Sequence, residues 1–275
     1  MYELSYIVLG IAEEVMGLRM LLSMVLGGAL AMGTPAPART APVQVTVAAA
    51  GDLRGVLEEL KSGFEARNPG VELRLSFGAS GSLTAQILQG APFDLFLAAD
   101  EGFPEQVRQA GLADARDVFP YATGSLTLWV RRDLGLDPSR DGWKVLSSPG
   151  VRRIAMANPV VAPYGRAAEA ALRRAGLYDG LKSRLVFAEN IAQAAQFCQS
   201  GAAEAGLLSA AQAGHPAMRE AGLAWVVPAG AYPPLRQGGV VLKAGRCADQ
   251  ARAFRDYLTG PDGQALLARH GYGKP

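Results

Sequence analysis

Short apolar runs alternate with amphipathic helical patterns along most of this chain, beginning at Val43. The first block predicts strands over 43–49, 72–77 and 95–98, and helices over 53–68 and 83–89. In the first helix, apolar residues recur on one face and charged residues lie opposite. Because single helices separate successive strands, the strands are expected to pair in parallel through right-handed crossovers. This pattern indicates a layered α/β fold.

A second block of the same kind follows. Its predicted strands are 125–130, 154–157, 185–188, 205–208 and 239–242, and its predicted helices are 165–175, 191–200, 249–258 and 263–269. Gly176 and Gly201 directly follow two of these helices, and glycine is a common helix stop because it adopts left-handed dihedrals without a Cβ clash. With 275 residues, of which 49% are hydrophobic, the chain is long enough for two domains.

Four stretches run from a predicted strand through a tight turn into a predicted helix. They are Ala49-Ala50-Gly51-Asp52, Gly78-Ala79-Ser80-Gly81-Ser82, Ala162-Pro163-Tyr164-Gly165 and Glu189-Asn190-Ile191. Asp52, either Ser80 or Ser82, and Asn190 are predicted N-caps, and Pro163 suits the first helical turn, where a missing N–H has no consequence. A cap alone is ordinary architecture. In open α/β sheets, however, these helix starts lie at the carboxyl ends of strands, where ligands bind.

A helix start offers unpaired main-chain N–H groups and the positive end of the helix dipole. Several helix starts that converge on one point would bind an anion without any Lys or Arg. A tetrahedral oxyanion held by N–H groups from both blocks is therefore the function that the turns favour.

The N-terminus has a different character. Arg19 precedes the apolar run 20–32, and a small-residue Ala36-Pro37-Ala38 site follows. This combination predicts a cleavable secretory signal peptide over residues 1–38, with Met16 or Met20 as alternative starts, and hence a periplasmic protein. The alternative is an uncleaved anchor, which the proline-rich stretch after Met32 disfavours.

Charge and cysteine content limit the other possibilities. The net charge is only +2, and the basic residues form no block or stripe of the kind that binds nucleic acid. Cys198 and Cys247 are compatible either with a disulfide in an oxidising compartment or with two buried thiols.

Six stretches taken in order resemble the periplasmic molybdate-binding proteins of ABC transporters. They are 48–53 (AAAGDL), 76–81 (SFGASG), 90–100 (GAPFDLFLAAD), 157–165 (ANPVVAPYG), 188–191 (AENI) and the closing YLTGP and HGYG within 257–273. The resemblance covers nearly all of the chain after Val43. It implies a type II periplasmic binding protein fold, in which two α/β lobes, each a mixed sheet flanked by helices, close on one oxyanion.

The same resemblance implies the lobe boundaries and the site. Lobe I would hold 39–123 and 239–275, and lobe II would hold 124–238. Ligand contacts would come from Gly51, Asp52, Ser80, Tyr164 and Ile191, the last two through their main-chain amides. The implied protein is a monomer without catalytic activity or cofactor, which passes molybdate, and also tungstate, to a permease and its ATPase.

Two positions depart from the family pattern. Many relatives carry a hydroxyl where Gly51 stands, and some carry Tyr where Ser209 aligns. Glycine still presents its N–H and lets an anion approach the backbone closely. Asp52 poses a different problem, because a carboxylate repels a dianion. We expect its side chain to cap the first helix, so that Asp52→Asn preserves anion binding while Ser80→Ala weakens it.

Two alternatives remain. The ligand is another oxyanion, such as sulfate or phosphate, or the chain is a serine hydrolase that uses Ser80. The hydrolase motif G-x-S-x-G is incomplete, because position 82 is Ser, and only His215 and His270 are available as a base. The sequence contains no Walker phosphate loop, no H-E-x-x-H motif and no Cys/His spacing typical of a metal site.

Overall fold

The computed structural model describes residues 41–275, so the predicted signal peptide lies outside the described residues. Ten strands form two five-stranded sheets within this range. Around the first sheet lie β1 (Val43–Ala50), the 3-10 helix η1 (Gly51–Leu53), α2 (Arg54–Arg67), β2 (Val71–Gly78), α3 (Ser80–Leu88), β3 (Leu95–Ala98), α4 (Gly102–Gln109), η2 (Ala115–Asp117), β4 (Val118–Gly124), β10 (Leu235–Val241), α11 (Ala248–Thr259) and α12 (Pro261–Arg269).

The second sheet is built from the middle of the chain. Around it lie β5 (Leu126–Arg131), η3 (Arg132–Leu134), α5 (Pro138–Asp141), η4 (Gly142–Ser147), β6 (Ile154–Ala157), α6 (Pro163–Arg174), α7 (Tyr178–Leu181), η5 (Lys182–Arg184), β7 (Leu185–Ala188), α8 (Ile191–Gln199), β8 (Ala205–Ser209), α9 (Ala210–Gly214), α10 (Pro216–Ala221), β9 (Gly222–Val226) and η6 (Ala229–Ala231).

The two sheets have the same kind of topology. The first has the strand order β2-β1-β3-β10-β4, and the second β7-β6-β8-β5-β9. In the first, β1 runs parallel to β2 and β3, whereas β10 is antiparallel to β3 and β4. In the second, β6 runs parallel to β7 and β8, whereas β5 is antiparallel to β8 and β9. The predicted two-lobed α/β fold with mixed sheets is therefore confirmed.

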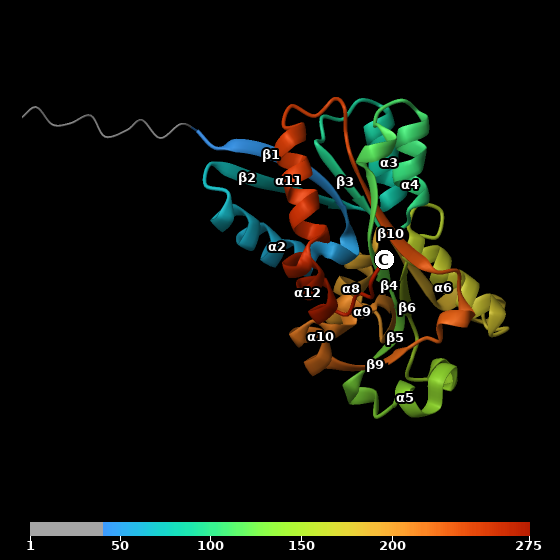
Figure 1. The fold of residues 1–275 in the computed structure, drawn as a ribbon. Coiled ribbons are helices and arrows are strands. Elements are labelled where there is room, and N and C mark those ends of the chain that lie inside the picture. The colour runs from blue at the N-terminus through green and yellow to red at the C-terminus, as the bar shows by residue number, and fades with distance from the viewer. Residues whose placement is uncertain (1–40) are drawn as a thin grey trace, which may run out of the picture. The chain divides into compact units, whose positions relative to one another are not determined.

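Helices cover both faces of the first sheet (Figure 1). On one face, apolar side chains of α2, α11 and α12 pack on β1 and β3 around Phe64 and Phe254, whose ring centroids are 5.1 Å apart. On the other face, α3 and α4 pack through Leu83, Ile87 and Val107. A third apolar cluster fills the second lobe around the buried Trp129. Each lobe thus has its own core, and this core holds the ends of the lobe's strands in fixed positions.

The strongest apolar patterns predicted their elements most accurately. The strands β3, β6 and β7 have the predicted bounds, and Gly176 and Gly201 adopt φ of 71° and 75° directly after their helices. The sequence did not predict α4, β4 or β9. It also predicted that β10 begins at 239, whereas it begins at Leu235, because polar Arg236 and Gln237 interrupt the apolar run. The expected lobe boundary 238/239 thus falls inside a strand of the first sheet.

Two segments connect the lobes. The chain leaves the first sheet at Gly124 and enters the second at Leu126, and it returns between Val226 and Leu235. The main-chain N–H of Leu126 donates to the Tyr232 hydroxyl at 3.0 Å, so the two crossing segments are hydrogen-bonded to each other.

The cysteines occupy different lobes and both are free thiols. Cys198 is buried in α8, where burial raises the pKa of its thiol to about 12, and Cys247 precedes α11. Within 41–275, no helix combines the length and apolarity needed to cross a bilayer.

Candidate anion-binding site

The four predicted turns meet at a single small cavity between the lobes. Its volume is about 10 Å³, close to the space that one water molecule needs, so the cavity as it stands excludes a sugar or a peptide. The residues that line it are Ala50, Gly51, Asp52, Gly78, Ala79, Ser80, Ala99, Ala162, Pro163, Tyr164, Asn190 and Ile191. All five residues named as candidate ligand contacts are among them. Each turn follows the carboxyl end of a parallel strand, namely β1, β2, β6 or β7.

Gly51 brings the first turn close to the second lobe. A Cβ atom at Gly51 would lie 3.0 Å from Asn190 Oδ1 and 3.3 Å from the main-chain nitrogen of Ala192. The amide of Gln212, from α9, also donates to the Gly51 carbonyl at 3.1 Å. The residue that replaces the family hydroxyl thus permits a close approach between η1 and the start of α8.

Ser80 is the first residue of α3 and is 1% exposed. Ala79 occupies the N-cap position and no side chain caps this helix, so the prediction that Ser80 or Ser82 is the cap is wrong. Instead, the Ser80 hydroxyl oxygen accepts a hydrogen bond from the Ala99 N–H at 3.0 Å. Because this contact uses a lone pair, the hydroxyl proton remains free to donate to a ligand.

The third and fourth turns come from the second lobe. Pro163 stands in the first turn of α6, as predicted, and Tyr164 follows it with 2% exposure. Asn190 caps α8, as predicted, because its side-chain oxygen accepts from the Gln193 N–H at 3.1 Å. Ile191 is therefore the first helical residue after a well-formed cap.

Three first-turn amides belong to residues that line this cavity. The N–H groups of Ser80, Tyr164 and Ile191 are too near their helix starts for an intrahelical partner. Within residues 41–275, none of the three donates to a backbone carbonyl of another element. The lining contains neither Lys nor Arg, so a bound anion would be held by uncharged donors and helix dipoles.

Asp52 does not cap the first helix, contrary to the prediction. The N-cap of α2 is Leu53, because a 3-10 turn intervenes between β1 and α2 and carries Asp52 inward. Asp52 is 1% exposed, and its Oδ2 accepts from Gln237 Nε2 at 2.8 Å and from the Tyr272 hydroxyl at 3.1 Å. The carboxyl group therefore belongs to a buried polar network and does not cap α2.

Tyrosine hydroxyls complete this network. Gln237 Nε2 also donates to the Tyr164 hydroxyl at 3.2 Å, and the Tyr121 hydroxyl donates to Gln237 Oε1 at 2.9 Å. Burial raises the pKa of Asp52, and the hydrogen bonds from Gln237 and Tyr272 oppose that shift only in part. Burial, with Asp52 as the next cause, holds the pKa values of Tyr121, Tyr164 and Tyr272 well above their usual range, so these hydroxyls stay protonated.

Sequence reasoning missed Gln237 and Tyr121. They stand in the unpredicted first part of β10 and in the unpredicted β4, where no local pattern marks them. Tyr272 lies in the HGYG stretch that carries the resemblance, which is the one signal for this network. Ser209 is not part of the cavity lining: its hydroxyl accepts from the Gln212 N–H at 3.1 Å and caps α9.

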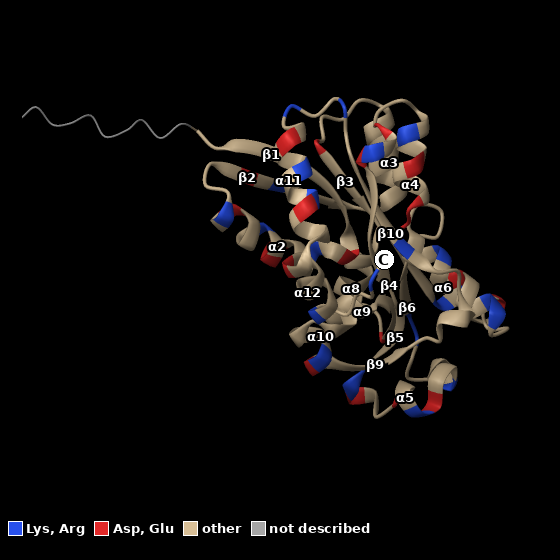
Figure 2. Cartoon of the chain, viewed as in Figure 1, with Lys and Arg blue, Asp and Glu red and all other residues tan. Residues whose placement is uncertain are grey.

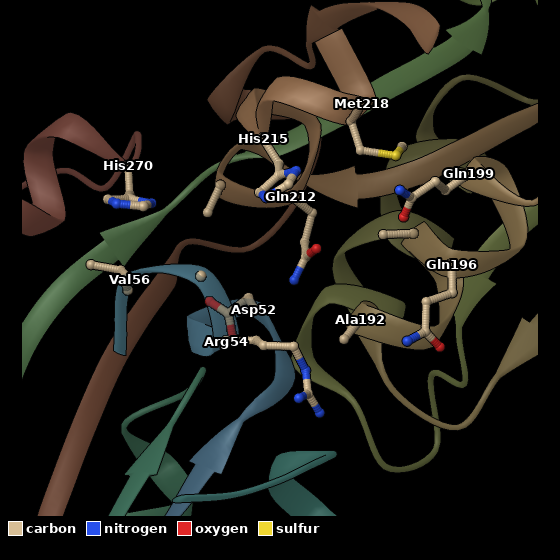
Figure 3. Close-up of a pocket in the computed structure, with 13 residues that line it drawn as sticks. Asp52, Arg54, Val56, Ala192, Gln196, Gln199, Gln212, His215, Met218 and His270 are labelled. Carbon is tan, nitrogen blue, oxygen red and sulfur yellow. The ribbon is translucent and has the colours of Figure 1, made fainter. Parts of the chain in front are cut away.

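The histidines do not contact Ser80. His270 Nε2 lies 2.8 Å from Glu59 Oε1, and His215 lines a separate groove together with Arg54 and Gln212 (Figure 3). Among the hydrogen bonds of residues 41–275, Ser80 Oγ is joined to Ala99 and to no histidine. The hydrolase alternative therefore lacks a general base at the serine.

Comparison with known proteins gives the family. The sequence profile of the bacterial extracellular solute-binding proteins matches residues 45–273. The molybdate-binding protein ModA of Azotobacter vinelandii is 38% identical over 86% of this chain and 91% of its own length, and that of Rhodobacter capsulatus is 34% identical over 89% and 93%.

The fold agrees with this assignment. The solved structure of the periplasmic molybdate-binding protein of Azotobacter vinelandii superimposes with a TM-score of 0.78 and 35% identity, covering 84% of this chain and 99% of that one. Both the identity and the coverage are high enough for relatives to share more than architecture. The chain therefore belongs to the bacterial extracellular solute-binding proteins, in the group of the molybdate-binding proteins ModA.

Proposed function

We propose that this protein captures molybdate, and also tungstate, in the cavity between its lobes and delivers the anion to an ABC permease and its ATPase. The observation that carries the proposal is the meeting of four helix starts from both lobes at one small cavity without a cationic lining residue. The names of the relatives, which are molybdate-binding proteins, support the choice of anion. The protein acts outside the cytoplasm as a monomer, after removal of residues 1–38.

The proposed ligand contacts are the Ser80 hydroxyl and the main-chain N–H groups of Gly51 or Asp52, Ser80, Tyr164 and Ile191. Charge-assisted hydrogen bonds contribute about 1.5–3 kcal/mol each, so five or six of them are enough for tight binding after the costs of ordering and desolvation. Molybdenum enters only as the centre of the oxyanion and needs no direct bond to the protein.

Lobe closure is the proposed mechanism. The donors come from both lobes, so an anion makes more contacts when the lobes are closed and shifts the population toward that state. A direct bond already joins the lobes beside the cavity, from the Gly81 N–H to the Val161 carbonyl at 2.9 Å. No catalytic step is required.

The test is a competition titration of molybdate, tungstate, sulfate and phosphate against the mature protein, followed by calorimetry. Molybdate and tungstate are expected to bind with similar affinity, because they have the same charge and shape, and to displace the other two, because the most similar relatives are molybdate-binding proteins. Ser80→Ala should weaken binding about tenfold, in line with the loss of one charge-assisted bond. Ser82→Ala, a nearby α3 serine outside the cavity lining, is the matched control and should bind normally.

Sulfate or phosphate as the tightest ligand would replace this proposal with the other-oxyanion alternative. Turnover of an ester that disappears in Ser80→Ala would instead favour the hydrolase.

A further inference from the structure

One atom of the site is left without a partner. Among residues 41–275, Asp52 Oδ1 is the single buried side-chain nitrogen or oxygen that makes no hydrogen bond. Such an atom is costly to bury and requires an explanation, and a ligand group that belongs beside it is one. Asp52 lines both the anion cavity and the neighbouring groove. In the groove the nearby cation, Arg54, lies over the Phe77 ring, so we look for the missing partner of Oδ1 in the anion cavity.

The two carboxyl oxygens have different surroundings. Oδ2 accepts two hydrogen bonds, from Gln237 and Tyr272, which both approach from the first lobe. Oδ1 accepts none. If an anion oxygen lies beside Oδ1, the carboxyl group is best satisfied as the neutral acid, with Oδ2 as the acceptor and the proton on Oδ1.

The anion itself requires the same state. An ionised Asp52 beside a dianion would place like charges together in a site without cationic lining residues. A protonated Asp52 would remove that repulsion and add one donor.

We propose that Asp52 is a neutral carboxylic acid when the oxyanion is bound, and that its Oδ1–H donates a hydrogen bond to an anion oxygen. The inference rests on the proposed function. The proton comes from solvent and stays on Asp52, so no bond of the anion forms or breaks. Burial, which raises the Asp52 pKa, already favours this state in the empty protein.

The groups around Asp52 are consistent with this assignment. Tyr121 of β4, Tyr164 of α6 and Tyr272 after α12 are neutral hydroxyls that cannot balance a negative charge. On the groove side, which Figure 3 shows, the nearest titratable or charged groups are Arg54, His215 and His270. The Arg54 guanidinium lies over the Phe77 ring at 4.3 Å, and His270 is bonded to Glu59, so both have other partners.

Infrared spectroscopy of the molybdate-loaded protein tests the protonation state directly. The wild type is expected to show the C=O band of a protonated carboxyl group, and Asp52→Asn is expected to lack it. The matched control is Asp94→Asn, a buried aspartate at the other end of β3, whose oxygens accept from Thr46 and Cys247. The band should persist in this control. A loaded wild type whose carboxyl region is identical to that of Asp52→Asn would overturn the proposal.

The pH dependence of affinity gives a second readout. Above the Asp52 pKa of the empty protein, wild-type affinity for molybdate should fall about tenfold per pH unit, because one proton is taken up with each anion. Asp52→Asn can turn its amide N–H toward the anion and should lose this dependence. It retains both histidines, so any pH effect that they cause persists in the variant.

The outcomes separate the inference from the proposed function. Molybdate binding without the acid band refutes only the Asp52 assignment. A wild type that prefers phosphate would favour an ionised Asp52 that accepts a proton from the ligand, and this result would overturn both the assignment and the choice of molybdate. Absence of binding to all four anions would remove both proposals.

Discussion

At the scale of single residues, Gly51 sets how closely the lobes approach. A serine there would place its Cβ 3.0 Å from Asn190 Oδ1, tighter than almost all real Cβ contacts, and would push η1 away from α8. We therefore expect Gly51→Ser to weaken molybdate binding about tenfold, the equivalent of roughly 1.4 kcal/mol, despite the added hydroxyl. Calorimetric titration measures this change.

The control for that substitution is Gly55→Ala. Gly55 lies in α2, and the nearest atom to a new Cβ would be His270 Nδ1 at 3.9 Å, an ordinary contact. Alanine should stabilise the helix by about 0.5–1 kcal/mol and leave anion affinity as it was. Equal or tighter anion binding by Gly51→Ser would show that the close approach of η1 and α8 does not govern affinity.

Asp52 also links stability to pH. Its pKa is raised in the folded protein, so the folded state holds the proton more tightly than the unfolded chain does. Stability from this group is therefore complete below the unfolded pKa of about 4 and is lost as pH rises toward the folded pKa. Asp52→Asn lacks this loss, so its melting temperature relative to wild type should be higher at pH 7 than at pH 4. Melting curves without anion measure the difference, and a gap that narrows as pH rises would contradict it.

A residue's role could be predicted from the sequence where that role depends on its neighbours along the chain. The Asn190 cap and the place of Pro163 follow from a few neighbouring residues, and both are confirmed. The role of Asp52 depends on Gln237 and Tyr272, which are distant in sequence and meet it only in the folded chain. Local capping rules therefore gave the wrong partner for a buried aspartate.

At the scale of elements, the start of α8 combines an ordinary N-cap, Asn190, with a place in the cavity lining. Asn190→Ala removes the bond to the Gln193 N–H, which should cost about 1 kcal/mol of stability. The same change loosens the first turn of α8, which carries the proposed Ile191 N–H donor, so anion affinity should fall as well. Denaturant unfolding and calorimetry measure the two effects separately.

Ser209→Ala provides the comparison. Ser209 caps α9 through an equivalent bond to the Gln212 N–H at 3.1 Å, outside the cavity lining. It should lose a similar amount of stability with little loss of affinity. If both variants lost affinity equally, the effect would be a general one of helix stability and the α8 turn would have no special role.

The strands show which elements could be predicted from the sequence and which could not. Fully apolar runs such as β3 and β6 were predicted with their observed bounds, because both faces of these strands are buried. The early part of β10 is polar, since Gln237 there serves the Asp52 network, and the register against β4 shifts between Gln237 and Gly238. The polar side chain that joins this network thus interrupts the apolar pattern by which the start of β10 could have been predicted.

At the scale of the whole molecule, the closed state depends on contacts that join the lobes outside the cavity. Figure 2 shows acidic and basic residues distributed over the helices of both lobes. Arg166 in α6 reaches Asp100, which follows β3, at 2.7 Å, and its guanidinium lies 5.3 Å from the Phe103 ring centroid. Breaking this pair affects only a state in which the lobes are together.

Arg166→Gln is therefore expected to speed anion release. Arg166 and Asp100 are 41% and 39% exposed, so the pair contributes no more than about 0.5–1 kcal/mol, and release should accelerate roughly two- to fivefold. The effect should shrink at high salt, because screening weakens the wild-type pair as well. Stopped-flow measurement of release at low and high salt tests both statements.

Arg173→Gln is the control. It breaks an equally short pair with Glu169 inside α6, within one lobe, and should leave release unchanged. Faster release in both variants would mean that helix charge, and not the contact between lobes, controls opening.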